Sequence, residues 1–150
     1  MSAAVASPVT GAVVPMGDVP DPVFAQAMVG PGVAVEPAGG EQEAVAPIDG
    51  TVVTLHPHAF VVAAEDGKGV LVHLGIDTVK QQGEGFTLRV VKGERVRAGQ
   101  PLIRWNPEVV RAAGYSAVVP VVALDARAES LSGLLAGGEI TAGEQLFVWD

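Results

Sequence analysis

HAFVVAAEDGKGVLVHLGID, residues 58–77, contains two apolar runs joined by a polar turn, and the fold can be argued from this stretch. The runs, residues 60–64 and 70–74, are short and rich in valine, which is typical of β-strands. Asp66 and Gly67 lie between them, and Asp-Gly is a frequent turn of β-hairpins. The segment therefore predicts a β-hairpin.

Similar valine-rich runs recur along the chain, separated by glycine and proline. They cover residues 32–35, 50–55, 86–91, 101–105, 117–123 and 145–149. This spacing predicts an all-β fold, a single-domain antiparallel β-sandwich or barrel, rather than an alternating α/β fold. Asp21 and Asn106 each precede a proline and predict short helical turns, because both residue types cap helices well. We expect a third short helix within residues 125–135 and a loop at 36–43.

Two internal repeats favour a duplicated β motif. PVTGAVV at residues 8–14 resembles PIDGTVV at 47–53, and AGQPLIRWN at 98–106 resembles AGEQLFVWD at 142–150. The length of 150 residues fits one domain. We predict that residues 1–7 form a disordered lead and that residues 8–150 form the domain.

Composition excludes several classes of function. The chain has no cysteine, so it has no disulfide, thiolate nucleophile or cysteine-bound zinc. Its net charge of −8 argues against nucleic acid and suits a partner with a basic docking face. No signal peptide or membrane-spanning run is recognisable, so we expect a cytoplasmic protein without a membrane anchor of its own.

The three histidines, His56, His58 and His73, attract attention because two lie in strand-like runs. If Asp66 and Gly67 form a two-residue turn, His73 faces Phe60, and His58 becomes its diagonal neighbour on the same sheet face. A loop with an odd number of residues would put the two rings on opposite faces.

Two imidazoles on one face can bind a metal, transfer a proton, or let one ring attack phosphorus while the other stabilises the charge. The chain has no G-x-S-x-G nucleophile elbow and no Walker loop. Neither a serine hydrolase nor an ATP-dependent phosphoryl transfer is therefore expected.

The run VHLGIDTV at residues 72–79, followed by GEGF at 83–86, resembles the signature of the glucose-type enzyme IIA family. This family belongs to the bacterial phosphoenolpyruvate:sugar phosphotransferase system. Further segments match in order, at residues 20–25, 29–32, 46–51, 58–60 and 141–144. The resemblance covers about residues 8–150.

The resemblance implies a phosphocarrier with an all-β sandwich built from a duplicated hybrid motif. His73 would be the phosphorylated nucleophile, and His58 would stabilise the phosphoryl group. The donor would be HPr, and the acceptor a cysteine on the IIB domain of a membrane sugar permease, so that sugar uptake is coupled to phosphorylation. The implied partner-binding residues are Asp21, Phe24, Val29, Leu71, Asp77 and Val79.

The same resemblance implies that no cofactor is required for transfer. It also allows a regulatory role towards other target proteins, with a zinc ion bridging His58 and His73 to a partner's carboxylate. The chain departs from the family at His56, where the family often has threonine.

The residues also suggest two other functions. His56 and His58 form an H-x-H, and His73 and Asp77 form an H-x-x-x-D, which are zinc-ligand spacings. In zinc peptidases of a related β fold the two pieces come in the opposite order. A lipoyl or biotinyl carrier is suggested by the hairpin at 96–102, but no lysine sits at its tip in a Met-Lys context.

Overall fold

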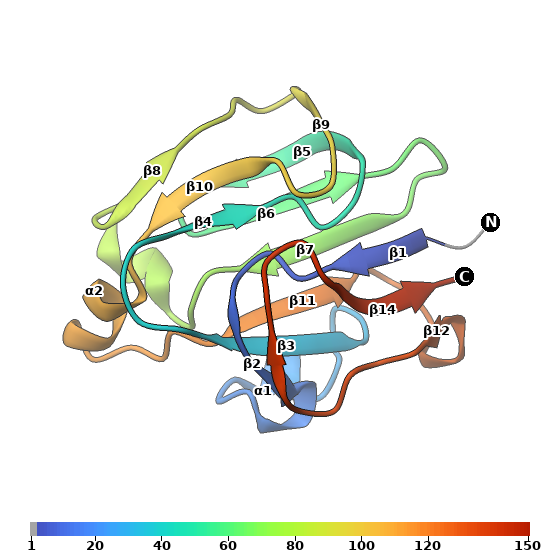
Figure 1. The fold of residues 1–150 in the computed structure, drawn as a ribbon, viewed down its shortest axis with the longest axis horizontal. Coiled ribbons are helices and arrows are strands. Elements are labelled where there is room, and N and C mark those ends of the chain that lie inside the picture. Colours follow the sequence, from blue (N-terminus) through green and yellow to red (C-terminus); the bar gives the residue numbers. More distant parts are fainter. Residues whose placement is uncertain (1–2) are drawn as a thin grey trace.

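The computed structural model describes residues 3–150 and contains three β-sheets (Figure 1). The large sheet has the strand order β13-β2-β3-β11-β7-β6-β5-β9, and two three-stranded sheets have the orders β4-β10-β8 and β1-β14-β12. All strand pairs are antiparallel. The predicted all-β fold is therefore confirmed.

The strands of the large sheet are β2 (Gly11–Pro15), β3 (Gly32–Pro37), β5 (Gly50–His56), β6 (Ala59–Ala63), β7 (Gly69–His73), β9 (Arg95–Val96), β11 (Val119–Ala123) and β13 (Glu139–Ile140). Those of the small sheets are β1 (Ala3–Ala6), β4 (Gln42–Val45), β8 (Phe86–Leu88), β10 (Pro101–Trp105), β12 (Leu131–Ser132) and β14 (Gln145–Trp149). The helices are α1 (Pro22–Ala25) and α2 (Pro107–Ala112), with 3-10 turns η1 (Met16–Asp18), η2 (Thr78–Gln81) and η3 (Ala128–Ser130).

One face of the large sheet packs against both small sheets and forms the main core. Alternate residues of the central strands point into it, among them Phe60 and Val62 of β6 and Val72 of β7. Trp105 and Phe147 come from the small sheets and are also buried. The residues of β7 between these core-facing positions point to the opposite face of the sheet, and His73 is one of them.

A second, smaller apolar cluster covers part of this outer face. It is formed where η1 and α1 pack on the sheet, and it contains Met16, Val19, Phe24, Ala34, Ile76, Val118 and Val122. The α1 turn begins as the sequence predicts, because the Asp21 Oδ1 accepts a hydrogen bond of 2.8 Å from the Val23 N–H. This arrangement places Phe24 on the same side of the sheet as His73.

Several predicted elements are confirmed, and others need correction. Asn106 caps α2, as expected, by accepting a hydrogen bond from the Glu108 N–H. The third helix is only the three-residue turn η3, and strand β8 ends at Leu88 rather than at residue 91. Among residues 3–150 no helix is long and apolar enough to cross a membrane.

The disordered lead predicted for residues 1–7 is wrong for the residues that the structure describes; residues 1–2 lie outside them. Ala3–Ala6 form β1, which pairs with β14 from Ala3↔Trp149 onward. Val5 is completely buried in the main core. The prediction failed because an alanine-rich stretch carries little strand propensity, while pairing with a distant strand overrides it.

The duplication suggested by the sequence is visible in matching backbone hydrogen bonds. In one copy the Ser7 N–H donates to Glu144 O and the Gly143 N–H to Ser7 O. In the other, the Ala46 N–H donates to Gln100 O and the Gly99 N–H to Ala46 O. Each pair joins the strand entry of one repeat to the glycine turn of the other, so the two halves are built alike.

The β6–β7 hairpin differs from its predicted register. The Ala64 N–H donates to Lys68 O and the Gly67 N–H to Ala64 O, so the loop contains three residues, 65–67, and not two. Gly67 has a φ of +93°, which such a loop requires at its last position. Consequently His73 pairs with Ala59, and Phe60 pairs with Val72.

Candidate active site

Three neighbouring strands present one residue each at the site. His56 is the last residue of β5, Ala59 the first of β6 and His73 the last of β7. His56 pairs with Ala59, and Ala59 pairs with His73, so the three side chains form a row across one sheet face. The row has a histidine at each end and a small residue in the middle.

His58 belongs to the turn between β5 and β6, which consists of Pro57 and His58. If His58 lay within a strand, its side chain would point to the same, core-facing side as that of Phe60. Because His58 lies in the turn, its side chain need not follow this strand alternation. Its ring centroid lies 5.1 Å from that of His73, in a T-shaped arrangement, and 5.7 Å from that of His56, in a stacked one. The His58 ring is thus in contact range of both other rings, and Ala59, the small residue of the row, is only 4% exposed.

The predicted proximity of His58 and His73 is therefore confirmed, although the register from which it was argued is wrong. With a three-residue loop, strand alternation alone would separate the two rings. The two rings meet because His58 lies in the turn and not in the strand. Ala59 was not predicted as part of the site, and His56 was named only for its H-x-H spacing with His58 and as the departure from the family's threonine; its stacking on His58 was not predicted.

The ring of His73 is oriented by a backbone carbonyl. Its Nδ1 lies 2.5 Å from Gly75 O. A carbonyl oxygen only accepts hydrogen bonds, so Nδ1 must be the protonated nitrogen. In the neutral ring the lone pair is then on Nε2, which makes no hydrogen bond within residues 3–150. The arrangement prepares Nε2 as a nucleophile.

The loop after His73 is held tightly in place. Thr78 is fully buried, and its Oγ1 donates to Leu74 O at 2.8 Å. The Ile76 N–H donates to Ser116 O, and the Leu74 N–H donates to His58 O. Gly75 has a φ of +83°, and a side chain there would place its Cβ 2.6 Å from Thr78 Cγ2. Only glycine fits at this position.

We expect Gly75→Ala to destabilise the protein by about 2–4 kcal/mol, from a left-handed backbone and a clash with Thr78 and Ser116. Gly99→Ala is the matched control, since Gly99 has a φ of +89° but open space around it. That variant should lose only about 1 kcal/mol. Denaturant titration measures both, and equal losses would show that the Gly75 site is not sterically constrained.

Burial governs the charge of the two inner rings. It lowers the pKa of His58 to about 4, with smaller contributions from the nearby His73 and His56 rings. Burial also lowers the pKa of His73, while its hydrogen bond to Gly75 and the charges of Asp21 and Asp77 oppose the shift. Both rings are therefore neutral near pH 7, as a nucleophile and its hydrogen-bonding neighbour require.

The residues predicted to bind partners surround the histidines to different degrees. The ring centroid of Phe24 lies 5.4 Å from that of His73. Val29 and Leu71 are half-buried against the same outer cluster as Phe24. Asp21 and Asp77 act electrostatically on His73, and Val79 on η2 is 59% exposed. Apolar and acidic groups thus flank His73, but their contacts with a partner stay a prediction.

The pair His58 and His73 offers at most two metal ligands. Within residues 3–150 no group of three or more histidine, aspartate or glutamate side chains is arranged to hold a metal ion. The zinc-hydrolase alternative therefore lacks a ligand set in the described residues. A zinc ion bridging the pair to a partner's carboxylate remains a prediction.

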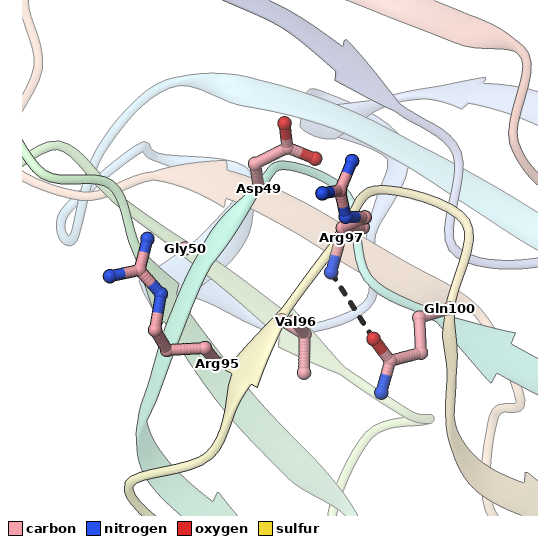
Figure 2. Close-up of a pocket in the computed structure, with 6 residues that line it drawn as sticks. All are labelled: Asp49, Gly50, Arg95, Val96, Arg97 and Gln100. Carbon is pink, nitrogen blue, oxygen red and sulfur yellow. Dashed lines mark hydrogen bonds between the residues drawn. The ribbon is translucent and has the colours of Figure 1, made fainter.

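A cavity of about 350 Å³ lies at the other end of β5, about 20 Å along the strand from His56. Figure 2 shows the residues that line it, among them Asp49, Arg95 and Arg97. Beside it, Glu65 forms an ion pair with Arg95 at 3.2 Å. The cavity takes no part in the histidine site.

Comparison with known proteins bears on this geometry. Residues 3–128 match the family model described as "phosphoenolpyruvate-dependent sugar phosphotransferase system, EIIA 1". The glucose-specific EIIA component of Oceanobacillus iheyensis is 39% identical over 142 residues, 93% of this chain and 85% of that protein. The glucose-specific EIIBCA component of Corynebacterium glutamicum is 42% identical over 124 residues, 81% of this chain but only 18% of that longer protein.

A solved structure agrees with the fold. The glucose permease IIA from Mycoplasma capricolum superposes with a TM-score of 0.89 at 28% sequence identity. The match covers 99% of this chain and 96% of the other. The similarity thus extends over the histidine site as well as the sheets.

Proposed function

The chain belongs to the EIIA family of the phosphoenolpyruvate-dependent sugar phosphotransferase system, and on this basis we propose that it carries a phosphoryl group on His73. The donor is HPr, and the acceptor is a cysteine of a IIB domain, which drives sugar uptake. The observation that supports His73 most directly is the hydrogen bond from Nδ1 to Gly75 O. It leaves Nε2 with the lone pair that must attack phosphorus.

In the first step, the Nε2 lone pair attacks the phosphorus of phospho-HPr in line. The P–N bond to HPr breaks, and the HPr imidazole leaves with the bonding electrons. The proton on Nδ1 stays in its hydrogen bond to Gly75, so the phosphorylated ring becomes cationic. His58 lies against His73 and can donate a hydrogen bond to a phosphoryl oxygen.

In the second step, the cysteine thiolate of the IIB domain attacks phosphorus, and the bond to Nε2 breaks. The His73 ring leaves as a neutral imidazole, because Nδ1 has kept its proton. Phosphoryl transfer depends mainly on positioning and on stabilisation of spread negative charge. The Gly75 carbonyl orients the nucleophile, and Phe24 excludes water from one side of it during docking.

The direct test is incubation of the chain with phosphoenolpyruvate, enzyme I and HPr, followed by mass spectrometry of the product. We expect one phosphoryl group, located on His73. Addition of a IIB domain should remove it. A phosphoryl group on His58 or His56, or none at all, would contradict the proposal.

We expect Val79→Asp to weaken binding to HPr about ten- to a hundredfold, because it places an unpaired carboxylate in the apolar part of the docking face. Val79 is 59% exposed, so the fold should be unaffected. Val91→Asp is the matched control, since Val91 is 67% exposed in the loop between β8 and β9. Calorimetric titration with HPr measures the affinity of both variants. Equal affinities would show that Val79 does not lie on the docking face.

A further inference from the structure

The ring of His58 has no hydrogen bond to hold it within residues 3–150. Its backbone is anchored, because the Leu74 N–H donates to His58 O at 2.7 Å. The ring itself makes two aromatic contacts, an edge-to-face contact with His73 and a stacked contact with His56. Its orientation therefore depends on what lies on either side of it.

His56 makes no hydrogen bond with its ring in the described residues either, and it is exposed. Its ring is inclined by only 22° to that of His58. Neighbouring strands lie about 4.8 Å apart, so the backbones of His56 and His73 lie about 10 Å apart, with Ala59 between them. The His58 ring is in contact range of the rings at both ends of this row.

We propose that His56 is a positioning residue: stacked on His58, it holds that ring in the orientation that faces His73. The inference rests on the proposed function, since the orientation matters once His73 carries a phosphoryl group. Among the described residues His56 makes no ring contact with His73, so its proposed effect on the orientation passes through His58.

Loss of the stack should slow phosphoryl transfer. An aromatic pair of this kind changes the population of the oriented ring about two- to tenfold, so His56→Gln should slow transfer by that factor. His56→Phe restores a flat ring without imidazole chemistry and should stay within about twofold of the unchanged protein. Arg97→Gln is a control at the other end of β5 and should have no effect.

A double-mutant cycle separates positioning from a direct role. If His56 acts only through His58, then His56→Gln should add nothing to the slowing already caused by His58→Gln. Single-turnover rates from phospho-HPr and to the IIB domain provide the four values. Additive effects, or a His56→Phe variant as slow as His56→Gln, would overturn the inference.

A second measurement does not depend on phosphorylation. Three-bond NMR couplings report whether the His58 side chain holds one χ1 rotamer. We expect one rotamer in the unchanged protein and in His56→Phe, and averaging in His56→Gln. If the unchanged chain accepts no phosphoryl group, the proposed function fails, while this measurement still decides the positioning; a single rotamer in His56→Gln would overturn it.

Discussion

His73→Ala will abolish phosphoryl acceptance from HPr, with a loss of about 10⁴-fold or more, because no other group in the site can replace the nucleophile. His58 is the nearest alternative, but within residues 3–150 no backbone carbonyl orients its ring, which contacts the rings of His56 and His73. The measurement is transfer from labelled phospho-HPr. Undiminished labelling of the variant would rule out His73 as the acceptor.

The fold should survive this change, which makes the result interpretable. The His73 ring is half-buried and makes one hydrogen bond, to Gly75 O. The loop keeps its other anchors, from Thr78 to Leu74 O and from Ile76 to Ser116 O. Cooperative thermal unfolding and an unchanged far-UV spectrum would confirm that only the chemistry is lost.

His58→Gln should still accept a phosphoryl group from HPr but pass it to the IIB domain poorly, about 10²–10⁴-fold more slowly. Glutamine keeps a hydrogen-bond donor near the phosphoryl oxygens, so acceptance largely survives. Glutamine can neither become cationic nor relay a proton, as imidazole can. Onward transfer should show the loss more, because it starts from the phosphorylated state, in which the phosphoryl dianion favours a cationic ring at position 58.

The pKa of His58 explains why the two half-reactions should differ in their sensitivity to His58→Gln. Burial lowers that pKa to about 4 in the unphosphorylated protein, so the ring is neutral when HPr docks at pH 7. A phosphoryl dianion on His73 would favour the cationic form. Stopped-flow measurement of both half-reactions provides the test. Equal slowing of both steps would make His58 a general electrostatic element, and no slowing of either would make it structural.

Much of the fold was predictable because local signals and tertiary structure agree. The valine-rich runs became β3, β5, β6, β7, β10, β11 and β14, and Asp21 and Asn106 cap helices as expected. The predictions failed where pairing with a distant strand determines the secondary structure, as in β1. They also failed where the same residues are compatible with two loop lengths. Asp-Gly serves in two-residue turns and in three-residue loops, so Asp66 and Gly67 did not determine the register.

The site was predictable in its residues more than in its geometry. His73 and His58 were identified, and their contact is real. The reason for that contact was hidden, because the position of His58 in a turn rather than a strand depends on where β5 ends. The acceptor of the hydrogen bond from His73 Nδ1 could not be predicted either. The direction of the Gly75 carbonyl depends on a left-handed φ, which is known only from the folded loop.

The pairing of β1 with β14 has a consequence for how the protein is made. The first and last strands are neighbours, and Leu146, Phe147 and Trp149 fill the core beside Val5. During synthesis on the ribosome, β14 emerges long after β1, so this side of the core stays open and β1 lacks this partner until then. In that interval the nascent chain must expose apolar surface, which chaperones would have to protect.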